Sequence, residues 1–263
     1  MLITSTKNDR IKALQKLEKS SERRKENIFV LEGTREIEKA IEAKFEFTEV
    51  FYNPNIVSES EVNLLFKKDI AKTAVSNHVF EGIAYRENRD GMIALARPKT
   101  TSLLDLQLSE NPLIIVLEAV EKPGNLGAIL RTADAAGADA VIVCDPKTDI
   151  YNPNVIRASI GCVFTKPVVC CESTEAIAFF RQKGIKTLAT TPYTDDIYFE
   201  QNLEQGIAIV MGTEADGLSD YWLHNTDIQV KVPMLGITDS LNVSVCLSVV
   251  LYEAVRQRII YSK

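Results

Sequence analysis

Three short segments combine glycine with polar side chains that could bind a ligand or take part in a reaction. They are "EKPGNLGAILR" (residues 121–131), "MGTEADGLS" (211–219) and "VPMLGITDSLNVS" (232–244). Each follows an apolar run typical of a buried strand, namely "PLIIVLEAV", "GIAIVMG" and "TDIQVKVPM". In a parallel α/β sheet, ligands bind beyond the carboxyl ends of the strands. We therefore expect the three loops to form one site.

The polar residues of these loops allow more than one function. Gly124 and Gly127 permit close backbone approach before a helix N-terminus, where Arg131 lies one turn further along. Glu214 can accept backbone hydrogen bonds or meet a ligand. Asp239-Ser240-Leu241-Asn242 stands at the start of a helix, and capping accounts for one polar residue there but not for three.

Several familiar chemistries lack their motifs in this sequence. There is no G-x-S-x-G elbow and neither histidine lies in a candidate loop, which disfavours a Ser-His-Asp hydrolase. The phosphate-loop motif G-x-x-x-x-G-K-[ST] is absent as well. Asp145 lies 21 residues after Gly124, as in a dinucleotide site, but G-N-L-G is not G-x-G-x-x-G.

The composition is that of a globular protein in a reducing compartment. The chain has 263 residues, 46% hydrophobic and 25% charged, with a net charge of −6. Its five cysteines form no CxxC pair and lie beside apolar runs, so we expect small buried thiols and no metal site. No apolar run is long enough to span a bilayer, and the first residues, "MLITSTKNDRIK", do not have the pattern of a signal peptide, so a cytoplasmic location is expected.

The elements that must position the loops divide into two parts. Helix and strand patterns in residues 1–100 predict a small α/β domain, and residues 97–112, rich in Pro, Thr and Ser, are the best linker candidate. In residues 101–263, Val- and Ile-rich strands alternate with helices, which predicts a parallel sheet covered on both faces. The segment from Lys7 to Lys25 contains eight basic and three acidic residues. This charge pattern is typical either of a surface that binds a phosphate backbone or of the solvent-exposed face of a helix.

Taken together, the three loops resemble the three motifs of the SpoU (TrmH-type) family of RNA ribose 2′-O-methyltransferases, within the SPOUT superfamily. The motifs are matched in order by "PGNLGAILRTADAAGADAVIV", "IVMGTEADGLS" and "VPMLGITDSLNVSVCLSVVLYEAVRQR". The segment "NPNVIRASIGCVF" between the first two is also similar. Less sharply, "ITSTKNDRIKALQKL" and "FVLEGTREIEKAI" resemble the substrate-binding domain often attached to these enzymes.

The resemblance implies a fold and a site that periodicity does not show. It implies a parallel-sheet α/β domain with a deep trefoil knot, which general topological rules would exclude. It also implies a homodimer, no metal, and S-adenosylmethionine bound by the knotted loops. The residues that line the cofactor would be Thr190, Gly212, Val232 and Leu241. The catalytic polar set would be Asn125, Arg131, Glu214, Ser240 and Asn242.

The implied reaction needs the methyl group held in line with a ribose oxygen, so positioning supplies much of the rate. The family pattern assigns loss of the 2′-hydroxyl proton to Arg131. Because arginine stays protonated, we expect it to stabilise the developing alkoxide while the proton passes to phosphate or water. Asn125 and Ser240 would orient groups at the reacting centre, Asn242 would support the cofactor, and Glu214 would fix the loop or Arg131.

The substrate implied is RNA, and ribosomal RNA before transfer RNA by analogy with the N-terminal domain. A catalytically inactive RNA-binding homologue is the alternative of a different class, and a nicotinamide or flavin enzyme is another. The residues expected to contact RNA are Lys7, Arg10, Arg23, Arg24 and Arg157, the last with the dimer interface as its alternative. Asp239 has no role in the pattern carried over.

Overall fold

The computed structural model describes residues 2–85 and 90–261, and these form two compact units. Unit 1 comprises Met1–Lys99 together with Asp149–Thr165, and unit 2 comprises Thr100–Thr148 and Lys166–Lys263. The first boundary falls within the predicted linker. The contiguous division at residue 100 differs from the structure in one respect, because Asp149–Thr165 packs with the N-terminal residues.

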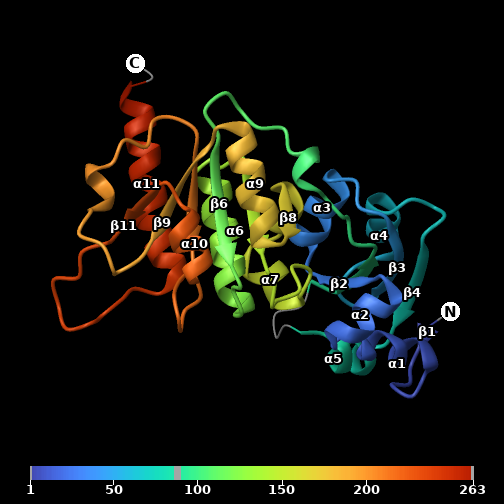
Figure 1. Cartoon of the computed structure of the whole chain (residues 1–263). Helices are drawn as coiled ribbons and strands as arrows, with labels where there is room; N and C mark the ends of the chain where they lie inside the picture. The colour runs from blue at the N-terminus through green and yellow to red at the C-terminus, as the bar shows by residue number, and fades with distance from the viewer. Residues whose placement is uncertain (1, 86–89, 262–263) are drawn as a thin grey trace. The chain divides into compact units, whose positions relative to one another are not determined.

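Unit 1 contains a mixed five-stranded sheet with helices between its strands (Figure 1). The strands are, in sheet order, β1 (Leu2–Ile3), β4 (Ala71–Val75), β3 (Phe47–Tyr52), β5 (Met92–Ala96) and β2 (Phe29–Glu32). The helices are α1 (Asp9–Lys16), α2 (Ser20–Glu26), α3 (Thr34–Glu42), α4 (Glu59–Leu65) and α5 (Asn77–Ile83). The basic run from Lys7 to Lys25 spans two helices, since the chain is extended at Lys19.

The inserted segment Asp149–Thr165 adds two short helices to unit 1, α7 (Pro153–Ala158) and α8 (Cys162–Thr165). Its aromatic side chains join those of the N-terminal residues: the rings of Phe29 and Tyr151 stack with centroids 4.6 Å apart, and those of Phe45 and Phe164 meet edge to face at 5.1 Å. Such pairs stabilise beyond their buried area. The segment is therefore part of the core of unit 1.

Unit 2 contains a six-stranded sheet in which every described pairing is parallel, as predicted. Its strands are, in sheet order, β11 (Ile228–Val230), β9 (Lys186–Thr190), β10 (Ile207–Met211), β6 (Leu113–Glu118), β7 (Ala140–Cys144) and β8 (Val168–Cys171). Short 3₁₀ turns lie at η1 (Leu103–Asp105) and η2 (Tyr198–Glu200). The central strands are buried along their whole length, which explains their continuous apolar runs.

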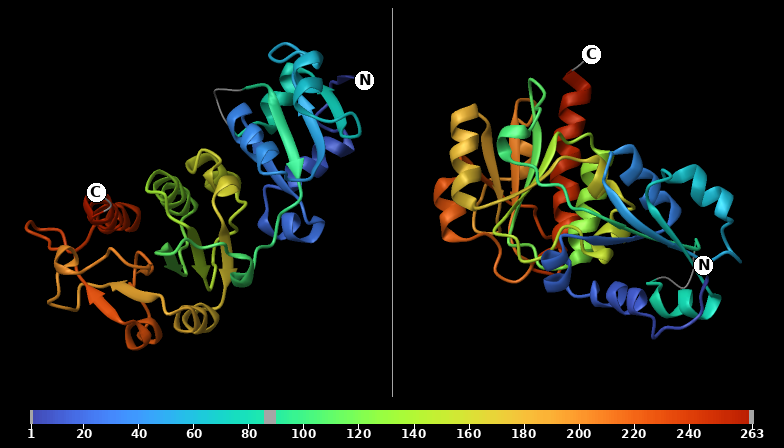
Figure 2. Two further views of the ribbon diagram at one scale, coloured as in Figure 1. Left: turned by 90° about the horizontal axis from the view of Figure 1, so that it is seen from above. Right: turned by 90° about the vertical axis from the view of Figure 1, so that its right-hand side faces the viewer.

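Helices cover both faces of this sheet, as the left view of Figure 2 shows for unit 2. α6 (Pro123–Ala135) and α11 (Val243–Tyr261) pack on each other at one face. α9 (Ser173–Lys183) and α10 (Asp220–Asn225) lie at the other, where Phe180 and Trp222 join one core cluster with the strands. None of the helices in the described ranges combines the length and apolarity that crossing a bilayer requires.

Candidate active site

The carboxyl ends of the parallel strands bring the predicted loops to one edge of unit 2. Thr190, the last residue of β9, pairs with Val230 of β11, and its neighbour Ala189 pairs with Val210 of β10. Met211 at the end of β10 pairs in turn with Leu117 of β6. The loops that follow β6, β10 and β11 therefore start along one edge of the sheet, with the end of β9 between the last two, although they are far apart in the sequence.

A chain of side-chain hydrogen bonds connects these three loops. Asn125, near the start of α6, donates from Nδ2 to Oε1 of Glu214 in the loop after β10. Asn242, immediately before α11, donates from Nδ2 to Oδ1 of Asn125 over 3.2 Å. The structure thus brings together three of the five residues of the predicted catalytic set, and Glu214 holds Asn125.

Asn242 also caps the last helix. Its Oδ1 accepts from the backbone N of Ser244 over 3.0 Å and from Oγ of Ser244 over 2.6 Å. A capping amide satisfies an otherwise unpaired N–H of the first turn. Asn242 therefore uses its side-chain oxygen to cap α11 and its amide nitrogen to bind Asn125, so it caps the helix and links the loops at the same time.

The loop after β10 is closed tightly by its own backbone. Thr213 and Gly217 exchange hydrogen bonds of 2.9 and 3.2 Å, and Gly217 adopts a positive φ of 71°. Gly212 packs so closely on this turn that an added Cβ would lie 2.1 Å from the carbonyl carbon of Gly217. Only glycine fits here, so Gly212 is required for the closed turn, while its contact with a cofactor stays a prediction.

A buried carboxylate that sequence reasoning missed supports the same loop. Glu118 ends β6 and is 7% exposed, and its Oε2 accepts from the backbone N of Ser219 over 2.8 Å. The next residue, Ala119, has a positive φ of 51°, and Asp145 after β7 has one of 49°. Positive φ is costly for residues with a side chain, so the turns after β6 and β7 are held by their surroundings.

The four residues predicted to line a cofactor lie on three strand ends and the start of α11. Gly212 is buried, whereas Val232 and Leu241 are half-buried. Thr190 Oγ1 is buried and has no hydrogen-bond partner among the described residues. A buried hydroxyl without a hydrogen-bond partner lowers the stability of the folded state, so such groups in proteins usually have a partner. A bound ligand with polar atoms at this edge would supply it, so the residues present fit a cofactor.

Arg131 and Ser240 are not drawn into the hydrogen-bond chain. The guanidinium of Arg131 is exposed on α6, without a hydrogen bond or ion pair to the residues that the structure describes. The side chain of Ser240 is exposed too, and its carbonyl oxygen accepts from Thr238 Oγ1 over 2.9 Å. Both side chains are available to a ligand or to another chain.

An exposed aromatic residue follows Thr190 and was also missed. Tyr193 is 85% exposed, and its backbone N donates to Thr191 Oγ1 over 3.3 Å. The only signal in the sequence is an aromatic residue between Pro192 and Thr194 in a strand-end loop. Large exposed aromatic rings at such an edge are suited to stacking on a ligand.

Two titratable groups near the edge have shifted pKa values. Cys246 lies in the first turn of α11, and burial raises the pKa of its thiol to about 11, so it is protonated at neutral pH. Hydrogen bonding and the charge of Lys147 lower the pKa of Glu121, which is paired with Lys147 Nζ at 2.7 Å. No cluster of three or more potential metal ligands occurs among residues 2–85 and 90–261.

The basic residues of unit 1 differ in what they contact. Arg23 is 3% exposed and pairs with Asp149 at 2.7 Å, while its Nη1 donates to the carbonyl oxygens of Leu17 and Glu18. Its donors are thus committed to the protein, which does not support the predicted contact with RNA. Arg10 pairs with Glu49 and donates to Thr73 Oγ1 over 2.6 Å.

The other basic candidates are open to solvent. Lys7, Arg24 and Arg157 are exposed, and none has a side-chain hydrogen bond or ion pair within the described part of the chain. Of the five residues predicted to contact RNA, Arg23 is therefore buried and paired, and Arg10 is paired at the surface. The other three are exposed and unpaired within the described residues.

The fold and site together define a class. Unit 2 is a parallel α/β unit whose strand-end loops are linked by hydrogen bonds among Asn125, Glu214 and Asn242, and in enzymes of this class ligands bind at the carboxyl edge of the sheet. The sequence matches the SpoU rRNA Methylase family over residues 112–252 and an MRM3-like substrate binding domain over residues 8–94. The chain belongs to the SpoU rRNA methylase family, as the motifs predicted.

Relatives match nearly the full length. The 23S rRNA (guanosine(2553)-2′-O)-methyltransferase RlmP of Bacillus subtilis is 30% identical over 259 residues, which are 95% of this chain and 98% of that one. An RNA 2′-O ribose methyltransferase of known structure is 41% identical with a TM-score of 0.85, covering 98% of this chain and 100% of its own. An AdoMet-bound rRNA methyltransferase from Sinorhizobium meliloti is 25% identical with a TM-score of 0.88, covering 97% of each.

Proposed function

We propose that this protein transfers the methyl group of S-adenosylmethionine to a ribose 2′-hydroxyl of 23S ribosomal RNA. The observation that carries the proposal is the hydrogen-bond chain Glu214–Asn125–Asn242, which joins the three motif loops at the carboxyl edge of the sheet. Two of the relatives named above are 2′-O-methyltransferases and the third is an rRNA methyltransferase with AdoMet bound, which supports both the predicted activity and the predicted cofactor.

The cofactor would be held by Thr190, Gly212, Val232 and Leu241. Gly212 lets its loop close against Gly217, because no side chain fits at that position, and the closed loop would form one wall of the cofactor site. Thr190 Oγ1 would gain the hydrogen-bond partner that the protein does not supply. Val232 and Leu241, each half-buried, would contact the apolar parts of the methionine and adenosine groups.

When bound, the cofactor supplies an electrophilic methyl group, and the protein must align and activate the acceptor. The guanidinium of Arg131, free of other partners within the described residues, would stabilise the charge that develops on the ribose oxygen. It would not remove the proton itself, because arginine stays protonated, so that proton passes to phosphate or water. Asn125, held by Glu214 and Asn242, would orient groups at the reacting centre, together with Ser240.

The catalytic unit would be a knotted homodimer in the cytoplasm. The knot would form where residues 231–242, which carry the third motif, meet the loops after β9 and β10. On α11, Val245, Tyr252, Ile259 and Ile260 are each at least 48% exposed, an apolar face that a second copy would cover. A second copy would also bring new partners to Arg131 and Ser240. A monomer in sedimentation equilibrium at micromolar concentration would contradict the dimer.

Residues 1–99 would bind RNA. Lys7, Arg24 and Arg157 are exposed and have no side-chain partner among the described residues, and Arg10 can exchange its partner Glu49 for a phosphate. Arg23 is left out because it is buried and paired. Affinity that depends steeply on salt concentration is the expected signature, and a salt-independent affinity would contradict it.

The test of the activity is transfer of labelled methyl from S-adenosylmethionine to ribosomal RNA. Arg131→Lys should lower kcat about a hundredfold, because an ammonium cannot reproduce the planar guanidinium, while cofactor affinity stays within about twofold. Arg181→Lys is the matched control, since Arg181 lies on α9 and donates to Asn225. Full activity of Arg131→Lys would contradict the assigned role.

Two alternatives have distinct outcomes in the same system. Mapping 2′-O-methylation across ribosomal and transfer RNA after deletion of the gene would reveal a transfer RNA substrate by a lost site there. An inactive RNA-binding homologue would bind RNA but incorporate no methyl group into either. The linked Asn125, Glu214 and Asn242 favour an active enzyme, since binding alone does not need them.

A further inference from the structure

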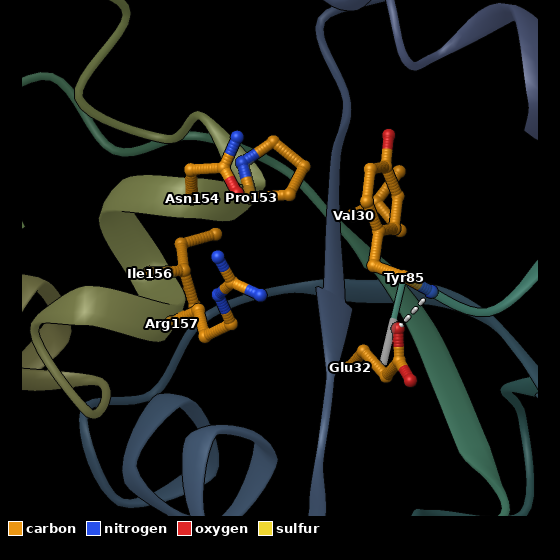
Figure 3. A pocket seen from close by; sticks show the side chains of 7 residues that line it. All are labelled: Val30, Glu32, Tyr85, Pro153, Asn154, Ile156 and Arg157. Carbon is orange, nitrogen blue, oxygen red and sulfur yellow. Dashed lines mark hydrogen bonds between the residues drawn. The ribbon is translucent and has the colours of Figure 1, made fainter. Parts of the chain in front are cut away.

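One small cavity in unit 1 is too narrow for a ligand. It lies between β2 and α7, and Val30, Tyr85 and Arg157 are among the residues that line it (Figure 3). Its volume is about 20 Å³, which is room for about one water molecule. The reactive groups that the proposed methyl transfer leaves unused lie instead among the cysteines of unit 2.

Two of these cysteines stand opposite each other where neighbouring parallel strands end. Cys144 is the last residue of β7, Cys171 is the last residue of β8, and the two are partners in the register of the sheet. Cys144 belongs to a core cluster against which Cys171 also packs, so both side chains lie on the same face. Adjacent strands lie about 4.8 Å apart, and the Cα atoms of a disulfide are about 4.4–6.8 Å apart. A bridge between the two cysteines therefore fits the existing strand spacing.

The two thiols already interact and differ in character. The Cys144 thiol donates a hydrogen bond to the sulfur of Cys171, which lowers the pKa of Cys171, while burial and nearby carboxylates oppose that shift only in part. The same hydrogen bond, together with burial, raises the pKa of Cys144. Cys144 is fully buried, as predicted for the cysteines, whereas Cys171 is half-buried. Cys171 is thus the thiol that a small oxidant reaches first, and Cys144 lies behind it.

We propose that Cys144 and Cys171 are a redox pair, closed to a disulfide by hydrogen peroxide and opened again by a dithiol. The Cys171 thiolate first attacks one oxygen of the peroxide, so that an S–O bond forms and the O–O bond breaks. The hydroxide that leaves takes up a proton and becomes water. The Cys144 sulfur then attacks Cys171, an S–S bond forms, the S–O bond breaks, and the departing hydroxyl leaves with the Cys144 proton as a second water. The two sulfurs together lose the two electrons that reduce the peroxide.

The bridge would close a loop that contains the whole of Asp149–Thr165, the segment that the chain contributes to unit 1 between β7 and β8. Such a cross-link stabilises mainly by restricting the unfolded chain. The end of β7 also supports the turn before the first motif loop, because the backbone N of Ala119 donates to the carbonyl oxygen of Cys144 over 2.9 Å. Oxidation would therefore fix the edge of the sheet from β8 to the turn after β6.

The experiment treats the full chain with a small excess of hydrogen peroxide and maps its thiols by peptide mass spectrometry. A Cys144–Cys171 link should form and should disappear with dithiothreitol. The temperature of unfolding should rise by about 5 °C in the oxidised protein. Trp222, the single tryptophan of the chain, belongs to the same core cluster, and its Nε1 donates to Ser173 Oγ over 2.8 Å. Its fluorescence should therefore change on oxidation and recover on reduction.

Alanine variants separate the roles of the cysteines. Cys170→Ala is the matched control, because Cys170 is exposed and successive side chains of a strand point to opposite faces, so the link should still form. Cys144→Ala should stop at the sulfenic acid of Cys171, which dimedone labels. Cys171→Ala should give neither a link nor a label at Cys144, since the buried thiol is not reached on its own.

Several outcomes would overturn the inference. They are a link through Cys170 or between two chains, unchanged thiols after peroxide treatment, dimedone labelling of Cys144 in place of Cys171, or oxidation of Cys171 to the sulfinic acid without a bridge. None of the measurements requires methyl transfer, so the redox pair and the proposed function fail separately.

Discussion

At the scale of single residues, the side chains and backbone of the candidate site are held in one conformation by hydrogen bonds and close packing. Asn125 uses its amide nitrogen for Glu214 and its oxygen for Asn242, so both of its polar atoms are satisfied by neighbouring loops. Gly212 stands where any side chain would strike the backbone of Gly217. These residues hold the loops in place before a ligand arrives, which is the preorganisation that catalysis by positioning requires.

Gly212→Ala should abolish cofactor binding and lower the free energy of unfolding by more than about 2 kcal/mol, because the added Cβ meets backbone that cannot move aside. Calorimetric titration with S-adenosylmethionine and thermal unfolding would measure the two effects. Gly124→Ala is the matched control, since nothing lies within 4 Å of its Cβ position and alanine favours helix. Normal cofactor affinity in Gly212→Ala would contradict the assignment.

At the scale of elements, adjacent residues of α2 have opposite surroundings. Arg23 is buried against Asp149 and two carbonyl groups, whereas Arg24 is exposed. Sequence spacing does not separate them, because both occur in one basic run. The bounds of α2 are set by Lys19, which is extended and precedes the helix, and by Asn27, which ends it in the left-handed conformation. The direction in which each arginine points follows from that short helix and its packing.

Arg23→Ala should lower the free energy of unfolding by about 2–3 kcal/mol, because the half-buried carboxylate of Asp149 and the carbonyl oxygens of Leu17 and Glu18 lose their charged donor. Denaturant unfolding of the whole chain measures this. Arg24→Ala should change stability by less than about 0.5 kcal/mol but weaken RNA binding and reduce its salt dependence. Equal stability of the two variants would show that the Arg23–Asp149 pair contributes little.

At the scale of the whole molecule, the chain leaves unit 2 after β7 and returns to it before β8. Between these points it contributes Tyr151, Phe164, α7 and α8 to unit 1. A fragment that begins at residue 100 would contain both unit 2 and Asp149–Thr165. It would lack residues 1–99, which bury that segment in the intact chain. The proposed RNA-binding and catalytic units are thereby joined at three places in the chain.

Removal of residues 1–99 should give an aggregation-prone protein, because Tyr151 and Phe164, now 9% and 6% exposed, would lose Phe29 and Phe45. Light scattering and the soluble fraction after expression would measure this. The same truncation with Tyr151→Ser and Phe164→Ser is the control and should be more soluble. A monodisperse, fully soluble truncation without these changes would contradict the structural role of the segment.

The sequence by itself determined the class of fold, the order of the motif loops and the family, because buried parallel strands and glycine-rich loops leave local patterns in the chain. The comparisons confirm the predicted family, activity and cofactor. Only the tertiary structure decided that Glu214 holds Asn125, that Glu118 supports the loop, and that Arg23 is internal. It also decided that Asp149–Thr165 belongs to unit 1. These outcomes depend on contacts between residues up to 126 positions apart, which no local spacing encodes.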